Sequence, residues 1–221
     1  MTAPRKTAAP ADEAPKPAGP GRPKDLSKRA AILEAATRMF IRLGYDATSM
    51  DQIAAEAGVS KLTVYSHFGD KEALFLAAVK AHCERFLPTL LFEPSPETPL
   101  RERLLAIAEA FWTMLSSPEA VQGHRMLCSP QLAGTPLAQM FWEVGPQRTH
   151  DDFAALLRRR VQAGELAIED VDRAAGQFFA LLEGEPYERL VYGCGETSPE
   201  EARAHTTSSV DLFLRAYASQ R

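Results

Sequence analysis

The sequence predicts an all-α fold in two parts, an N-terminal domain of three helices that contains a helix-turn-helix and a larger C-terminal helical bundle. Three observations lead to this prediction. Each strong apolar segment repeats at the 3.6-residue period of a helix, and no segment alternates as a half-buried strand would. Capping residues or first-turn prolines open most of these segments. A proline-rich loop at residues 93–99 divides the chain.

The chain begins with a segment that is not expected to fold. Residues 1–25 are rich in proline and alanine, with scattered charges, and they bury too little apolar surface to form a core. We therefore expect a disordered tail at 1–25, an N-terminal domain with its connecting helix at 26–86, and a C-terminal domain at 87–221. Arg22 in the tail could enter a DNA minor groove, although a solvated linker is an equal alternative.

The N-terminal domain carries clear signals for helix ends. Its first helix is expected at 26–43 and ends at Gly44. Ser49 and Gln52 have the spacing of a capping box, so a second helix should start there. Gly58 can turn left-handed without a side-chain clash, and Ser60 can cap a third helix. Two short helices joined by a tight turn form a DNA-reading unit, although such a pair can also serve packing alone.

The third helix should have one buried and one exposed side. Val64 and Phe68, four residues apart, can seat it on the core. The side chains expected to contact DNA in and around this helix are Thr48, Ser49, Lys61, Leu62, Thr63, Tyr65, Ser66, His67 and Lys71. Residues 61–63 should lie nearest base edges. Phosphates should be held by Lys71, Tyr65, His67 and the Thr48 hydroxyl.

These residues resemble the DNA-binding domain of the TetR family of bacterial transcriptional regulators. The matching motifs are Gly58-Val59-Ser60, Thr63-Val64-Tyr65, His67-Phe68 and Asp70-Lys71-Glu72-Ala73-Leu74. The resemblance covers residues 26–86 and implies a homodimeric regulator, most often a repressor, that binds a near-palindromic operator in double-stranded DNA and responds to a small-molecule effector. Residues 118–193 more weakly resemble the C-terminal domain of the AefR-like branch of that family.

The C-terminal part is expected to hold a ligand cavity. A connecting helix at 71–86 leads to helices at 100–116, 118–127, 136–144, 146–163, 171–192 and 199–218. Large, adaptable side chains gather in the middle of this bundle, where a cavity of about 300–1,000 Å³ would suit an apolar or amphipathic ligand. Its expected lining is Phe111, Trp112, Leu115, Met126, Phe141, Trp142 and Phe178. Polar groups would come from Gln122, His124, Arg125 and Glu143.

The last two helices are expected to mediate dimerisation. They carry more apolar side chains than one bundle is expected to bury, among them Phe178, Phe179, Leu212 and Phe213. We expect these stripes to pair with a second copy of the chain, and charging Phe179 or Phe213 to give folded monomers. The alternative is that they only complete the core of the monomer.

Composition and missing motifs narrow the remaining possibilities. The 221 residues are 45% hydrophobic and 24% charged, with no apolar run of membrane-spanning length, so we expect a cytoplasmic protein without membrane contact. Positive charge is concentrated in residues 1–91, where 13 Lys and Arg face 10 Asp and Glu, as suits a DNA-binding end. Three cysteines without metal-like spacing favour reduced thiols. No catalytic or metal motif is present, so we expect neither cofactor nor metal, with a helical enzyme or a structural helical adaptor as alternatives.

Overall fold

The computed structural model describes residues 25–93 and 98–219, and its helices confirm the all-α prediction. The helices are α1 (Leu26–Leu43), α2 (Met50–Glu56), α3 (Lys61–Phe68), α4 (Lys71–Phe86), α5 (Leu100–Leu115), α6 (Pro118–Leu127), α7 (Pro136–Trp142), α8 (Arg148–Gln162), α9 (Val171–Tyr192) and α10 (Pro199–Tyr217). A 3₁₀ turn, η1 (Thr89–Leu91), follows α4, and a π-helical turn, η2 (Glu143–Gln147), joins α7 to α8. Arg22 and most of the loop at 93–99 lie outside the described residues.

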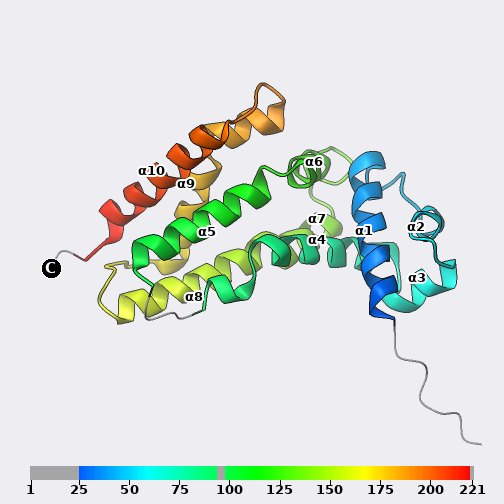
Figure 1. Cartoon of the computed structure of the whole chain (residues 1–221), viewed down its shortest axis with the longest axis horizontal. Coiled ribbons are helices and arrows are strands. Elements are labelled where there is room, and N and C mark those ends of the chain that lie inside the picture. Colours follow the sequence, from blue (N-terminus) through cyan, green and yellow to red (C-terminus); the bar gives the residue numbers. More distant parts are fainter. Residues whose placement is uncertain (1–24, 94–97, 220–221) are drawn as a thin grey trace, which may run out of the picture.

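The molecule is elongated, and the helix-turn-helix lies far from the C-terminal end of the last helix. Figure 1 shows α2 and α3 at one end of the long axis and the last turns of α10 near the other. Helices α4, α5 and α8 run roughly along that axis between them. No helix in the described part of the chain is long and apolar enough to cross a membrane.

Local capping chemistry sets the N-terminal helices as predicted. Ser49 and Gln52 form a reciprocal capping box, with the Ser49 N–H donating to Gln52 Oε1 at 2.9 Å. Ser60 caps α3 and Asp70 caps α4, each accepting a backbone N–H three residues on. Gly58 has φ +65°, a conformation that side-chain-bearing residues rarely adopt, and it lets the chain reverse between α2 and α3.

The N-terminal helices share a core with residues from much later in the chain. Ile32, Ile53 and Val64 are fully buried in this core. Leu132 and Leu137, from the segment between α6 and α7 and the start of α7, are also buried in it. The boundary predicted near residue 87 is therefore crossed by packing, which ties the α6–α7 region to the helix-turn-helix.

The C-terminal bundle is organised around a cluster of phenylalanines. Phe153 of α8 stacks on Phe178 of α9 with ring centroids 4.5 Å apart, and Phe178 meets Phe213 of α10 edge-to-face at 5.2 Å. Phe179 lies against Phe153 at 5.2 Å. Phe178, Phe179 and Phe213 are all buried inside one chain, so these rings complete the core of the monomer, and we expect a charge at Phe179 or Phe213 to destabilise the folded chain rather than only to separate a dimer.

The helix expected to end near residue 144 instead continues into α8. Pro146 was expected to open a separate helix, yet it lies inside the π-helical turn between α7 and α8. A π-turn pairs residues five apart and can absorb a proline that lacks an N–H. The Thr149 hydroxyl also donates to the Gly145 carbonyl at 3.1 Å, one turn back in the same segment.

Helix α9 is kinked, which the sequence pattern did not reveal. Gly184 has φ +48° and ψ −168°, and Pro186 follows two residues later. The proline has no N–H for the Leu182 carbonyl, and His205 Nε2 from α10 lies 2.9 Å from that oxygen instead. The Ser209 hydroxyl donates to the Leu181 carbonyl at 3.2 Å. Two polar side chains of α10 thus satisfy the backbone carbonyls that the kink releases.

Candidate nucleic-acid interface and cavity

Helix α3 presents a continuous exposed face at one end of the molecule. The buried side of α3 is as predicted, since Val64 is fully buried and Phe68 is nearly fully buried. Lys61, Tyr65 and Ser66 are exposed, and Leu62 is 79% exposed. A leucine this exposed gains nothing from the protein's own core, whereas a base edge such as the methyl group of thymine would cover it.

The polar residues of this face are held by local contacts. Lys61 Nζ lies 2.8 Å from Asp51 Oδ1, an exposed ion pair that raises the pKa of Lys61 chiefly through the hydrogen bond to Asp51. The hydroxyls of Ser60 and Thr63 are 2.8 Å apart, and the Ser66 hydroxyl donates to the Thr63 carbonyl at the same distance. Such exposed bonds are weak and can be exchanged for contacts to DNA.

Thr48 has a different environment from the one predicted. Its side chain is buried, and its hydroxyl donates to the carbonyl of Gly44 at 2.7 Å and approaches that of Met39 at 3.3 Å. A hydroxyl engaged inside the protein has no proton to donate to a phosphate. The structure therefore removes Thr48 from the phosphate-binding set and gives it the role of fixing the turn after α1. Ser49 is exposed, but its hydroxyl caps α2.

Two other residues predicted to bind phosphate lie between the exposed face and the core. Lys71 Nζ is 4.3 Å from the centroid of the Tyr45 ring and donates to the Tyr45 carbonyl at 3.1 Å. His67 Nδ1 is buried without a hydrogen-bond partner among the described residues. An unpaired polar atom beside the exposed face is costly in the free protein and available for a new partner.

A cavity of about 580 Å³ lies where the two parts of the chain meet. Its walls come from α5, α6, α7, η2, α8 and α9 of the C-terminal bundle, and also from α1 and α4. Thr37, Phe40 and Ile41 are the α1 residues in this wall, and Phe75 and Val79 are among those of α4. A molecule in this cavity would touch the helices that carry the helix-turn-helix.

Five of the seven apolar residues predicted to line a cavity do so, namely Phe111, Leu115, Met126, Phe141 and Trp142. Trp112 and Phe178 do not. Trp112 packs against His205 with centroids 5.5 Å apart, and Phe178 lies in the phenylalanine cluster. Phe179 lines the cavity where Phe178 was expected to, because the side chains of adjacent helix residues point about 100° apart.

The polar lining also differs in part from the predicted set. Gln122 and His124 line the cavity. Arg125 does not, because its guanidinium donates to the Val191 and Leu190 carbonyls at 2.6 and 2.7 Å, and Glu143 bonds Gln139 outside the cavity.

Several polar lining groups were not predicted from the sequence, and they include Glu119, Glu183, Tyr187, His82, Cys83 and His150. Glu183 and Tyr187 follow Phe179 at four-residue spacing on α9. A carboxyl on an otherwise apolar helix face could therefore have indicated from the sequence that this face lines a cavity.

Desolvation shifts the pKa values of several groups of the cavity toward their neutral forms. Desolvation is the leading cause that lowers the pKa values of His82, His124 and His150, so these imidazoles are neutral near pH 7. Desolvation also raises the pKa of the Cys83 thiol to about 11 and raises the pKa values of Glu183 and Tyr187. A protonated, half-buried thiol is a poor nucleophile, so Cys83 contributes shape to the cavity wall.

A helix-turn-helix joined to a helical bundle with an apolar cavity defines the class of ligand-responsive bacterial transcriptional regulators. Residues 32–78 match the family model described as bacterial regulatory proteins, tetR family. Residues 102–219 match the model of the C-terminal domain of AefR-like transcriptional repressors. The chain belongs to the TetR family, with a C-terminal domain of the AefR-like type.

Curated relatives and solved structures agree with this assignment. The transcriptional activator FasR of Mycolicibacterium smegmatis is 36% identical over 117 residues, which are 51% of this chain and 52% of FasR. The regulator RutR of Escherichia coli K12 is 33% identical over 64% of this chain and 65% of RutR. The match thus spans about half to two thirds of these relatives' length.

The solved structures match over more of the chain. A TetR-family regulator from Mesorhizobium loti is 30% identical, with a TM-score of 0.73 over 87% of this chain and 98% of that one. The flavonoid-responsive regulator FrrA is 31% identical, with a TM-score of 0.71 over 89% and 100%. These similar proteins are regulators, not enzymes, so the enzyme alternative is set aside.

Proposed function

We propose that this chain is a homodimeric, sequence-specific DNA-binding repressor, released from a near-palindromic operator by a small apolar or amphipathic ligand. The observation that carries the proposal is the cavity wall shared by α1 and α4 with the C-terminal bundle. Occupancy of this cavity acts directly on the two helices that position α2 and α3.

Reading of the operator is assigned to the exposed face of α3. Lys61, Leu62 and Thr63 at its start suit base edges, as the N-terminal residues of a recognition helix do. Lys71, Tyr65 and His67 flank this face and suit the phosphates, with Lys71 exchanging its Tyr45 carbonyl contact for a phosphate oxygen. The basic end of the chain adds a long-range attraction for DNA.

Release follows from linkage between the cavity and the spacing of the reading helices. A ligand that prefers one arrangement of α1 and α4 shifts the protein toward that arrangement by its differential affinity. Leu132 and Leu137 provide a second connection, since they extend from the α6–α7 segment into the core beneath the helix-turn-helix. Couplings of this kind usually change DNA affinity by about 5–150-fold.

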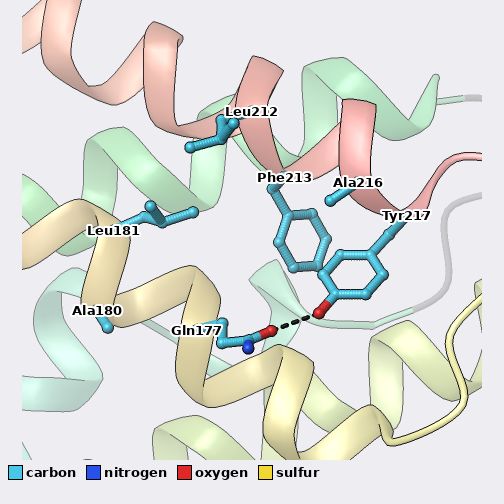
Figure 2. A pocket seen from close by; sticks show the side chains of 7 residues that line it. All are labelled: Gln177, Ala180, Leu181, Leu212, Phe213, Ala216 and Tyr217. Atoms are coloured by element: carbon cyan, nitrogen blue, oxygen red, sulfur yellow. Dashed lines mark hydrogen bonds between the residues drawn. The ribbon is translucent and has the colours of Figure 1, made fainter.

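Dimerisation is assigned to the outer face of α9 and α10. Figure 2 shows Ala180 and Leu181 of α9 and Leu212 and Ala216 of α10 around a shallow groove, with the Tyr217 hydroxyl bonded to Gln177 across it. Leu212 is 45% exposed. A second copy related by a two-fold axis would cover this face and set the distance between two α3 helices.

The test measures operator binding by fluorescence anisotropy, with DNA from upstream of the chain's own gene. Compounds are first screened by Trp142 fluorescence, because Trp142 lines the cavity whereas Trp112 does not. A hit should weaken operator binding of the native protein by about 5–150-fold. Met126→Trp should fill the cavity and abolish this response while operator binding persists, and Leu90→Trp, on the exposed η1 turn, should respond normally. A hit that released Met126→Trp with unchanged potency would place the effector site elsewhere.

A further inference from the structure

An exposed ion pair joins the two helices of the helix-turn-helix. The Nζ atom of Lys61, the first residue of α3, lies 2.8 Å from Oδ1 and 3.0 Å from Oδ2 of Asp51 on α2. Both side chains stay more than half exposed, at 59% for Lys61 and 63% for Asp51. The same Nζ atom lies 5.9 Å from the centre of the Tyr65 ring. One donor and one acceptor are therefore held side by side at this end of the molecule.

The ion pair is not needed to hold α2 against α3. Ile53 of α2 and Val64 of α3 are fully buried in the same core. The Val59 N–H donates to the Ala54 carbonyl at 3.0 Å and closes the turn between the two helices. An exposed ion pair adds little to such packing, because water screens it. The two charged side chains can therefore take up new partners without rearranging the helices.

A carboxylate at a DNA-facing surface restricts what that surface can bind. Phosphates repel it, so a part of the surface that carries it is poorly suited to the DNA backbone. The Asp51 carboxylate bonds the first residue of the reading helix and would lie at the DNA surface together with Lys61. The groups in the major groove that can donate to a carboxylate are the amino groups of cytosine and adenine. Asp51 therefore suits a base edge better than a phosphate.

The order of groups across a base pair distinguishes cytosine from adenine. A G·C pair presents two adjacent acceptors, N7 and O6 of guanine, and then the N4 donor of cytosine. An A·T pair presents the N6 donor of adenine between two acceptors, so a carboxylate on N6 would meet an acceptor on either side. O6 and N4 of a G·C pair bond each other at about 2.9 Å, close to the 2.8 Å between Lys61 Nζ and Asp51 Oδ1. One donor beside one acceptor at this spacing matches a G·C pair.

We infer that Asp51 and Lys61 read one G·C base pair in each half-site as a unit. Lys61 Nζ donates to O6 and N7 of guanine, and the Asp51 carboxylate accepts from N4 of the paired cytosine. The ammonium has three N–H donors, so it can keep its bond to Asp51 while it contacts guanine. The inference rests on the proposed function, because it adds Asp51 to the reading face and names the base pair that the start of α3 selects.

The test measures base preference with the full chain. Selection from a random-sequence DNA library identifies the native site, and fluorescence anisotropy gives dissociation constants for each single base-pair change in it. One G·C pair per half-site should be preferred over A·T by roughly tenfold. Asp51→Asn should bring this ratio close to unity, because an amide offers the donor and the acceptor that adenine takes. Lys61→Met should reduce the preference at the same base pair, and the double variant should reduce it no further than the stronger single change.

Glu56→Gln is the matched control for the loss of charge. Glu56 is also on α2, and it pairs with Arg38 of α1 at 3.2 Å. Asp51→Asn and Glu56→Gln each remove one negative charge near DNA, so both should strengthen binding to every sequence slightly. The ratio between sites therefore reports base reading, and Glu56→Gln should keep the native ratio. Circular dichroism and urea unfolding establish that the variants are folded.

The outcomes separate this inference from the proposed function. If Asp51→Asn changed the affinity for all sites by one common factor, the carboxylate would act only through general electrostatics or through the helix pair, and the inference would be overturned. Effects of the Asp51 and Lys61 variants at different base pairs, or a native site without a G·C preference that depends on Asp51, would overturn it as well. In these cases the native chain still selects a site, and the DNA-binding function stands. A native chain that selects no site would remove both.

Discussion

Thr48 shows how one hydroxyl can be assigned to two different roles. Its position before α2 suggests a phosphate contact, whereas its burial and its 2.7 Å bond to the Gly44 carbonyl assign it to the turn. Thr48→Val keeps the shape and leaves that carbonyl without its partner, so we predict a loss of about 1–2 kcal/mol in the free energy of unfolding. Urea denaturation followed by circular dichroism measures this loss.

The matched variant Thr48→Ser retains the hydroxyl and should lose less stability. Operator affinity of the folded Thr48→Val protein, measured well below its urea midpoint, should equal that of the native chain. A weakened affinity with unchanged stability would restore the phosphate role that the sequence suggested.

At the residue scale, capping could be predicted and cavity lining only in part. The caps at Ser49, Ser60 and Asp70 depend on neighbours three residues away, so the sequence contains all the information. Whether Phe178 or Phe179 faces the cavity depends on the rotation of α9 against α8 and α10, which arises from packing over the whole bundle. Both are apolar, and a pattern of apolar residues cannot distinguish a core from a cavity wall.

At the scale of the element, the kink of α9 has a direct mutational test. A Cβ on Gly184 would lie 3.0 Å from His205 Cε1, in a conformation with φ +48° that is unfavourable for any side chain. We predict that Gly184→Ala lowers the free energy of unfolding by about 1–3 kcal/mol. Gly176→Ala, in a regular turn of the same helix and with no atom within 4 Å of the added Cβ, should instead be neutral or stabilising by up to about 1 kcal/mol.

Thermal and urea unfolding of the two glycine variants give the comparison. Equal effects of the two substitutions would mean that the backbone at Gly184 accepts a side chain without cost, and the kink would then not depend on a glycine at this position.

The helix boundaries show where local rules for proline held and where they missed a feature of the fold. Pro118, Pro136 and Pro199 open helices as the rules predict. Pro146 lies inside the π-helical turn between α7 and α8, and Pro186 lies two residues after the break at Gly184, where the second half of α9 begins. At this break the carbonyls of Leu182 and Leu181 are bonded by His205 and Ser209, about twenty residues further along the chain. A rule restricted to neighbouring residues cannot include partners that only the fold brings close.

At the scale of the whole molecule, the dimer proposal predicts different outcomes for adjacent residues. Leu212→Glu places a charge on the exposed α9–α10 face and should give folded monomers that bind the operator weakly. Phe213→Glu places the charge in the phenylalanine cluster and should unfold the chain. Leu90→Glu, exposed on η1, is the control for an added surface charge and should remain dimeric.

Sedimentation velocity at micromolar concentration, together with circular dichroism, distinguishes these outcomes. A native chain that sediments as a monomer would remove the dimer proposal, as would a Leu212→Glu variant that remains dimeric.

The burial of Leu132 and Leu137 beneath the helix-turn-helix limits how this chain can be rearranged. A fragment that stops after α4 would lack two side chains that close its own core, and each missing buried leucine costs on the order of 2–5 kcal/mol. The DNA-reading end is therefore not an exchangeable module. A chimaera that grafts it onto another regulator's ligand domain needs residues 126–141 of this chain as well, and those residues also bring part of the cavity wall, so specificity for DNA and for ligand would be inherited together.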